Sequence, residues 1–311
     1  MNYLIFGDIH ITEKDIKECE SVLNEIITLK EKYKVNKIIL TGDTFDKVNP
    51  TSIELDLFSD FIKKLNIPII ILVAQSHESI TPTESILNHF GILKNNLKIV
   101  KEYIDENHLY VGHFTLQESK MHFGSKKSKK EFEKYKYVIL GHQHTFEIIK
   151  PNIVHIGSIR YVDFAESQDK QKVVLLMENY KEKNEKCHFL SLNSPIPMKD
   201  VYLTKKTDKP LPQSSYAQSI EELKAILDKI DSNTKVRVIF DNFEGYKNFR
   251  PLYEIYKKKF KLFKDRKDFT MNYDLVASER KDISLKDSFN QFLKINKVNE
   301  DIKQILLKEI K

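Results

Sequence analysis

The chain has 311 residues, of which 41% are hydrophobic and 31% charged, and a net charge of +6. This length favours two domains, and the apolar fraction is sufficient for a buried core. No apolar run approaches the roughly 20 residues that span a bilayer, which argues against a membrane span. Cys19 and Cys187 are the only cysteines, which argues against a disulfide framework. We therefore expect a cytoplasmic protein without a membrane partner.

The first part of the chain alternates between strand and helix patterns. Strands are predicted at 2–6, 37–41 and 68–74, with helices at about 13–33 and 51–65 between them. This β-α-β-α-β order predicts a layered α/β domain in which helices cover the faces of a sheet.

Shorter segments follow. We expect strands at 97–100, 108–111, 137–140, 153–156 and 173–177. The polar, lysine-rich stretch 116–136 predicts a loop with a short helix. Two prolines in 193–200 then predict a linker, so the first domain is expected to end near residue 195.

A smaller α+β domain is predicted over 200–275. Its strands are expected at 201–203 and 235–240. One helix is expected to begin where Ser219 and Glu222 form a capping box, and a second is expected at 249–259.

The tail, residues 280–311, has the spacing of two amphipathic helices. These helices either pack on the body of the chain or form a docking surface for another subunit. The sequence pattern does not decide between the two.

Five short segments in the first half of the chain end in side chains that bind metals, and most follow an apolar run. They are Gly7-Asp8-Ile9-His10, Gly42-Asp43, His77-Glu78, Gly112-His113 and Gly141-His142-Gln143-His144. Side chains delivered repeatedly at strand ends can converge on divalent metal. Mixed oxygen and imidazole ligands suit Mn²⁺ and tolerate Fe²⁺, whereas an all-oxygen set favours Mg²⁺. Each motif is weak alone, but together they predict a dimetal site.

The order Asp-x-His, Gly-Asp, His-Glu, Gly-His, Gly-His-x-His resembles that of the calcineurin-like metallophosphoesterase superfamily. Residues 156–166 are similar to a segment of SbcD-type DNA repair nucleases, in which a Gly-Ser turn and an Arg precede Phe-x-Glu. The motif match covers roughly 1–180, and beyond 200 the similarity is architectural. The resemblance implies a layered sheet sandwich flanked by helices, with a smaller domain and a tail after it. The nuclease domain would be residues 1–195, the capping and DNA-binding domain 200–275, and the helical tail 280–311.

The resemblance also implies roles for individual residues. One metal would be held by Asp8, His10 and His144, the other by His113 and His142, with Asp43 bridging both. The cofactor would be two Mn²⁺, with Mg²⁺ or Fe²⁺ as alternatives. A metal-activated water would attack phosphorus in line. His77 would be catalytic, stabilising or protonating the leaving oxygen.

One position departs from the family pattern. The family places an Asn that ligates the second metal before this histidine, whereas the chain has Gln75-Ser76. Three interpretations remain open. The second metal binds more weakly with Ser76 as a poor ligand, Gln75 supplies an amide oxygen, or the site is disabled and the chain acts in assembly.

Arg160, Lys126 and Lys127 are candidate DNA-binding residues. The structural alternatives are pairing of Arg160 with Asp163 or Glu166, and solvated lysines. Tyr161 and Phe164 are interpreted as core residues rather than base-stacking ones.

These observations predict a Mn-dependent DNA exo- or endonuclease subunit of an SbcCD-type repair complex. The resemblance implies double-stranded DNA ends as substrate, a homodimer, and an SbcC-type ATPase bound through 283–311. One alternative is a generic metallophosphoesterase that cleaves nucleotides or phosphoprotein. The other is a DNA-end-binding assembly subunit whose catalysis is weakened by Ser76.

Overall fold

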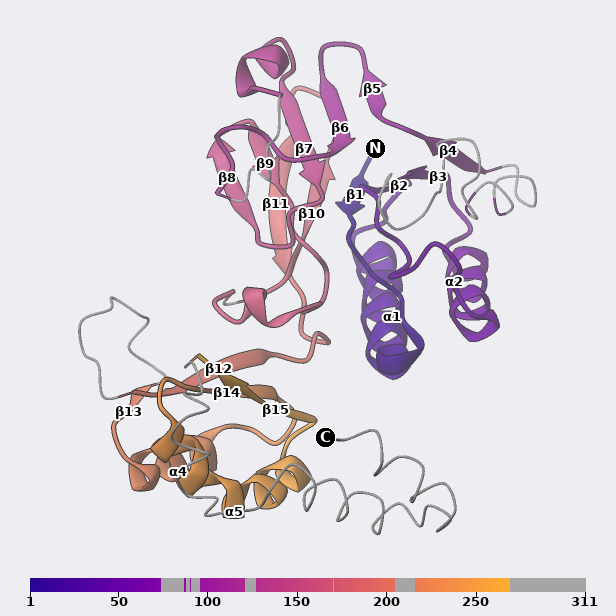
Figure 1. Cartoon of the computed structure of the whole chain (residues 1–311). Coiled ribbons are helices and arrows are strands. Elements are labelled where there is room, and N and C mark those ends of the chain that lie inside the picture. Colours follow the sequence, from indigo (N-terminus) through magenta and orange to yellow (C-terminus); the bar gives the residue numbers. More distant parts are fainter. Residues whose placement is uncertain are drawn as a thin grey trace, which may run out of the picture.

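A computed structural model describes residues 1–73, 87, 90, 96–120, 127–169, 171–204 and 216–268 of the chain. It shows a mixed α/β fold with three sheets and few helices, which confirms the expected fold class (Figure 1). Among these residues, no helix is both long enough and apolar enough to cross a membrane. The predicted tail at 280–311 lies outside the described residues.

The first sheet has six strands in the order β11-β10-β1-β2-β3-β4. Strands β1 to β4 run parallel, and β10 and β11 extend the sheet in antiparallel pairing. The bounds are Tyr3–Phe6 (β1), Lys37–Leu40 (β2), Ile69–Leu72 (β3), Leu97–Val100 (β4), Val173–Glu178 (β10) and Lys186–Ser191 (β11).

The second sheet has five strands in the order β5-β6-β7-β9-β8, with β6, β7 and β9 parallel. The bounds are Tyr103–Asp105 (β5), Leu109–His113 (β6), Tyr137–Gly141 (β7), Glu147–Lys150 (β8) and Ile153–His155 (β9). A short 3-10 helix, η2 (Lys129–Phe132), lies in the stretch predicted as a loop with a short helix. Phe132 and Tyr135 of this region pack on the outer face of the second sheet.

The alternation of side chains along β1 explains how the layers are built. Tyr3 and Ile5 point into a core shared with the second sheet, whereas Leu4 and Phe6 point into a core shared with the helices. Those helices are α1 (Ile16–Lys32) and α2 (Ser52–Leu65), which lie beside β1 to β4 in Figure 1. Both faces of β1 are therefore buried, as its unbroken apolar run requires.

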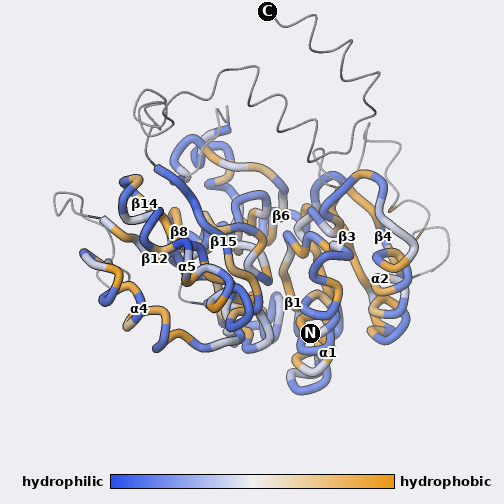
Figure 2. The backbone as a smooth tube through the Cα atoms, turned by 60° about the horizontal axis from the view of Figure 1, so that its bottom comes forward, coloured by the Kyte–Doolittle hydropathy of each residue, from blue (hydrophilic) through white to orange (hydrophobic). Residues whose placement is uncertain are grey.

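The remaining strands form a four-stranded, all-parallel sheet in the order β13-β12-β14-β15. Its elements are β12 (Met198–Leu203), β13 (Tyr216–Ala217), α4 (Ile220–Lys229), β14 (Lys235–Phe240), α5 (Phe243–Lys259) and β15 (Leu262–Lys267). We call the described part of residues 198–268 the small domain. It has a hydrophobic core of its own. Figure 2 shows hydrophobic and hydrophilic residues alternating along α4, as expected for a helix with one buried face.

Two elements of the small domain begin earlier than predicted, and one predicted cap differs in detail. Strand β12 begins at Met198, inside the predicted linker, because Met198 packs against Tyr161 and Phe164. Helix α5 begins at Phe243 rather than 249, because the Asn242 side chain caps it by accepting a hydrogen bond from the Gly245 amide. Ser219 caps α4 as predicted. In a capping box the Glu222 carboxylate would accept a hydrogen bond from the Ser219 amide, but here it accepts one from the Gln218 amide.

Candidate metal centre

The candidate ligands lie where strands of the two large sheets end. Asp8 and His10 follow β1, Asp43 follows β2, His113 ends β6, and His142 and His144 follow β7. Strands β1 and β2 are parallel neighbours in one sheet, and β6 and β7 are parallel neighbours in the other. The carboxyl ends of both pairs therefore meet at one edge of the sandwich.

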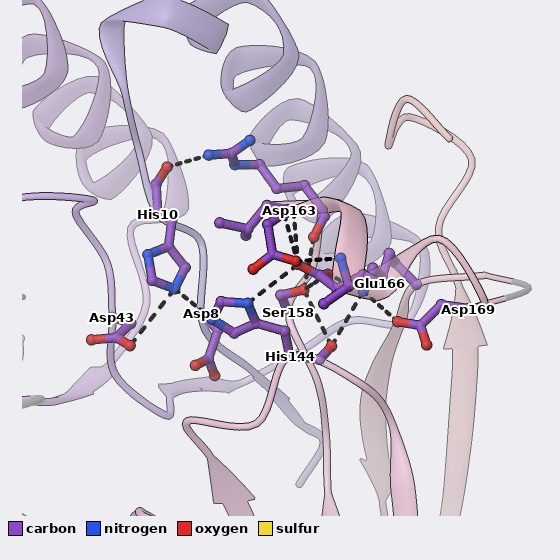
Figure 3. A network of polar contacts seen from close by, with 12 residues as sticks. Asp8, His10, Asp43, His144, Ser158, Asp163, Glu166 and Asp169 are labelled. Atoms are coloured by element: carbon purple, nitrogen blue, oxygen red, sulfur yellow. Dashed lines mark hydrogen bonds and ion pairs between the residues drawn. The ribbon is translucent and has the colours of Figure 1, made fainter. Parts of the chain in front are cut away.

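Four of these residues form what we call the first cluster: Asp8, His10, Asp43 and His144. One ligand atom from each lies within 4.8 Å of the others. The His10 Nε2 atom lies 3.0 Å from His144 Nε2 and 3.6 Å from Asp43 Oδ2. Figure 3 shows these four side chains close together, with Asp8 and His10 from one loop and Asp43 and His144 from other segments of the chain.

The second cluster consists of Asp43, His113 and His142. The His113 Nε2 atom lies 3.3 Å from Asp43 Oδ2 and 3.3 Å from His142 Nδ1. Asp43 belongs to both clusters, and a carboxylate with two oxygens can bridge two ions. The structure thus brings together all six described residues that the sequence resemblance assigned to metals, in the same two groups.

The backbone at this site adopts an uncommon conformation. Asp8, His10, Asp43 and His142 have φ values of 50°, 48°, 46° and 80°. Non-glycine residues at positive φ are uncommon, and such strain concentrates at functional sites. Backbone hydrogen bonds hold the loops in place: the Asp8 amide donates to the Gly42 carbonyl at 2.9 Å, and the His10 amide to the Asp43 carbonyl at 3.0 Å.

The glycine before Asp43 is required by both conformation and space. Gly42 has a φ of 119°, and a Cβ there would lie 2.5 Å from the His113 Nδ1 atom. A side chain at this position would displace the histidine ring. This explains why the ligand motif reads Gly-Asp.

Two histidine rings are oriented by contacts of their Nδ1 atoms with other parts of the chain. His113 Nδ1 lies 2.8 Å from the Thr41 carbonyl, and His144 Nδ1 lies 3.2 Å from Glu166 Oε1. An imidazole that donates one N–H in this way presents its other nitrogen as a metal ligand. The backbone thus supports one cluster, and a carboxylate supports the other.

Glu166 is the centre of a buried polar network. Its carboxylate accepts hydrogen bonds from the Ser158 hydroxyl, the Lys172 ammonium, and the amides of Val162 and Asp163. Burial would raise the pKa of Glu166, but hydrogen bonds and the charges of His144 and Lys172 outweigh it and lower the pKa to about 2. Glu166 is therefore ionised next to His144. From the sequence, Glu166 was considered as a partner of Arg160, and Lys172 was not identified as part of the site.

The donor set fits two divalent ions. Two carboxylates and four imidazoles point at shared positions, and the ligand atoms of each cluster lie within 4.8 Å of one another. Burial and the neighbouring His113 lower the pKa of His142, which favours the neutral ring that metal binding requires. Mixed imidazole and carboxylate ligands suit Mn²⁺ or Fe²⁺.

Residues 1–146 match the sequence profile of the calcineurin-like phosphoesterase family. The match covers slightly less than half of the chain and identifies a calcineurin-like phosphoesterase domain in this region. The matched region contains all six residues of the two clusters. Divalent metal is therefore the expected cofactor of the phosphoesterase domain, and hydrolysis of phosphoesters its chemistry.

Among solved structures, the chain is similar to one described as the crystal structure of Pseudomonas putida nuclease MPE. The two share 16% sequence identity with a TM-score of 0.31. The likeness covers 49% of this chain and 66% of that chain, slightly less than two thirds of it. No curated protein sequence matches the chain.

Four residues to which the sequence analysis gave a role lie outside the described residues: Gln75, Ser76, His77 and Lys126. Lys127 is exposed, with its Nζ atom 3.7 Å from the centre of the Phe114 ring. Phe114 directly follows the ligand His113, so the Lys127 ammonium lies next to the segment that carries this ligand of the second cluster. It remains a candidate phosphate contact.

Arg160 is placed differently from either prediction. Its side chain is buried, and it donates to the carbonyls of Ile9 at 2.8 Å and His10 at 2.6 Å. The expected pairing with Asp163 or Glu166 is wrong, because the guanidinium instead faces Asp15 and Glu18. This burial leaves it no exposed surface for DNA. Tyr161 and Phe164 are buried, as predicted.

His155 of the phosphoesterase region gives the chain an expected sensitivity to acid. It is fully buried in β9 beside the Ser119 hydroxyl at 2.8 Å, and burial lowers its pKa to about 4. An unfolded histidine takes up its proton near pH 6.5, so the unfolded state binds more protons between these values. Stability should fall by about 3 kcal/mol in total as the pH drops from roughly 6.5 to below 4.

Urea denaturation of the metal-free chain between pH 7 and pH 4 measures this effect. His155→Gln should lose this part of the pH dependence. The control is His188→Gln, which replaces an exposed histidine on β11 and should keep the pH dependence. An identical pH slope in the unmodified chain and His155→Gln would contradict the expectation.

Proposed function

We propose that this chain is a Mn²⁺-dependent phosphodiesterase that cleaves DNA. The observation that carries the proposal is the pair of ligand clusters that share Asp43. When bound, two ions would activate a water and neutralise charge on the phosphate oxygens during in-line displacement. Phosphodiester hydrolysis is the reaction class that such a centre serves.

The chain's own residues would bind the ions and keep the ligand side chains correctly oriented. Asp8, His10 and His144 would hold one ion, and His113 and His142 the other, with Asp43 common to both. Glu166 fixes the His144 ring, and the Thr41 carbonyl fixes the His113 ring. From the sequence resemblance, His77 would supply a proton to the leaving oxygen.

Exposed basic residues of the small domain support a nucleic-acid substrate. Exposed basic side chains are concentrated at the end of α5 and along β15: Lys257, Lys258, Lys261, Lys264, Arg266 and Lys267. Lysine and arginine contacts to phosphates supply most of the non-specific affinity for DNA. The proposal therefore gives residues 200–275 the role of a capping domain that contacts DNA.

The proposal extends to assembly on the basis of sequence resemblance. Residues 1–195 would form the nuclease domain, and 283–311 would bind an SbcC-type ATPase. The complex would act in the cytoplasm on double-stranded DNA ends as a homodimer. Co-purification of the chain with and without residues 283–311 tests the docking part.

A second candidate function rests on Ser76. A serine hydroxyl is a poorer ligand for a divalent ion than the amide oxygen of the family's asparagine, so the second cluster would hold its ion weakly. The chain would then act as a DNA-end-binding assembly subunit with little catalysis.

Cleavage of end-labelled linear DNA across a Mn²⁺ titration tests the proposed function. We expect cleavage by the unmodified chain, and Ser76→Asn should lower the Mn²⁺ concentration for half-maximal cleavage by about tenfold, equivalent to ~1.4 kcal/mol of binding. Cleavage only after Asn is introduced would favour the assembly subunit. Turnover of small phosphodiesters without DNA cleavage would favour a generic phosphoesterase.

A further inference from the structure

Buried polar contacts connect the first cluster to the small domain by two separate routes. Both routes begin at a ligand of the same cluster, one at His10 and one at His144. Each passes through residues that are not among the ligands of either cluster. Together they point to a function for the packing of the small domain against the phosphoesterase domain.

The first route begins at the backbone of His10. Arg160 donates to the carbonyls of Ile9 and His10, and its Nη1 atom lies 3.4 Å from Asp15 Oδ2. Figure 3 shows the hydrogen bond that reaches the His10 carbonyl. The ligand His10 is thus held through its main chain at a strained φ of 48°.

The first route then crosses into the small domain through a buried lysine. Lys235, the first residue of β14, places its ammonium 3.2 Å from Asp15 Oδ2 and 2.7 Å from Glu18 Oε2. The side chains of Arg160, Glu18 and Lys235 are each only 2% exposed. Two cations and two carboxylates balance one another here, so none of the four can leave without cost.

The second route begins at the ring of His144. Glu166 binds His144 Nδ1 and lies at the end of the 3-10 helix η3 (Phe164–Glu166). The Phe164 ring of this helix lies 4.8 Å beneath the Arg237 guanidinium of β14. The next residue, Ser167, donates a hydrogen bond to Asp200 Oδ2 of β12 at 3.0 Å.

Asp200 and Arg237 complete the second route inside the small domain. The guanidinium donates to both Asp200 oxygens at 2.8 Å, a two-pronged pair with defined geometry. The helix that holds Glu166 is therefore packed directly on two strands of the small domain. A shift of these strands would move the carboxylate that orients His144.

The second cluster is anchored within the phosphoesterase domain. His113 faces the Thr41 carbonyl, and the His142 amide donates to Asp8 Oδ1 at 2.9 Å. These contacts come from Thr41, directly after β2, and from Asp8 in the loop after β1, and neither contact involves η3 or the small domain. The two clusters therefore differ in how they are supported.

We propose that packing of the small domain sets the Mn²⁺ affinity of the first cluster, with Lys235, Arg160 and Glu166 as positioning residues. The inference rests on the proposed metal-dependent function and adds a means of regulating it. Metal affinity depends on the direction of each ligand, and residues that orient ligands change it by about 10- to 100-fold. By reciprocity, Mn²⁺ in the first cluster stabilises the packed small domain.

Removing the Lys235 charge should break the first route. In Lys235→Met, Arg160 is the one cation left of this buried group to balance Asp15 and Glu18, which draws the guanidinium away from the His10 carbonyl. Mn²⁺ binding to the full chain is measured from the electron paramagnetic resonance signal of the free ion. Lys235→Met is made in His142→Ala, which retains the first cluster, and in His144→Ala, which retains the second.

We expect Lys235→Met to weaken Mn²⁺ binding about tenfold in His142→Ala and to leave it unchanged in His144→Ala. Lys235→Arg, which keeps the charge, should restore most of the affinity. Ser167→Ala removes a contact of the second route without stranding a buried charge, and should weaken binding in the same background. Tyr256→Phe removes a hydrogen bond to Asp228 wholly inside the small domain and should have no effect.

Equal changes in both backgrounds, or no change in either, would overturn this inference while leaving the metal centre intact. Loss of affinity in Tyr256→Phe would also overturn it, since general destabilisation would then explain the result. Absence of Mn²⁺ binding by the unmodified chain would overturn the proposed function, and this inference with it.

Discussion

Replacement of Asp43 with alanine is expected to reduce metal-dependent phosphodiester hydrolysis by about 10³-fold or more, a loss of ~4 kcal/mol of transition-state stabilisation. Within the described residues, Asp43 alone belongs to both clusters, so its loss removes a ligand from each ion. Hydrolysis of a small aryl phosphodiester and of linear DNA in Mn²⁺ measures the effect. Both substrates should be affected equally.

Two further variants separate the chemistry from the backbone strain at this position. Asp43 has a φ of 46°, which alanine tolerates less well than asparagine, so Asp43→Asn keeps the conformation while removing the charge. Asp60→Asn makes the same chemical change on α2, where Asp60 pairs with Lys63 on the surface. Asp43→Asn should be inactive and Asp60→Asn fully active. Activity above a tenth of normal in Asp43→Asn would argue against a bridging carboxylate.

The second large effect is expected at Glu166, which touches no reacting group. Glu166→Gln should weaken Mn²⁺ binding by about 10- to 100-fold, because the ring of His144 loses the carboxylate that orients it and raises its basicity. The loss should be recovered at high Mn²⁺ concentration, unlike the loss in Asp43→Ala. A metal titration of both binding and hydrolysis measures this difference.

Asp169 provides a matched control for Glu166. It also pairs with the Lys172 ammonium, at 2.6 Å, but is not among the contacts of His144. Asp169→Asn removes the same charge from the same network and should destabilise the fold without changing Mn²⁺ affinity. Equal weakening of Mn²⁺ binding in both variants would mean that the network acts through stability alone.

The strands that position the site could be predicted because they are buried on both faces. Residues 2–6, 37–41 and 68–74 are apolar runs, and the structure places β1, β2 and β3 there. The five strands that were not predicted all lie at the edges of their sheets: β5, β8, β11, β13 and β15. An edge strand buries less of its surface, so its sequence carries little of the apolar pattern used to find strands.

The amino-acid sequence alone determined which residues could bind metal, because each ligand motif follows a strand directly and is read locally. Only the tertiary structure decided what holds those ligands. Glu166 reaches His144 across 22 residues of chain, and Lys235 reaches Glu18 across 217. Such contacts join polar residues that have no periodic pattern or fixed spacing, so their partners appear only when the folded chain excludes water around them. The same physical reason explains why Arg160, an apparent surface cation in the sequence, is a buried support of His10.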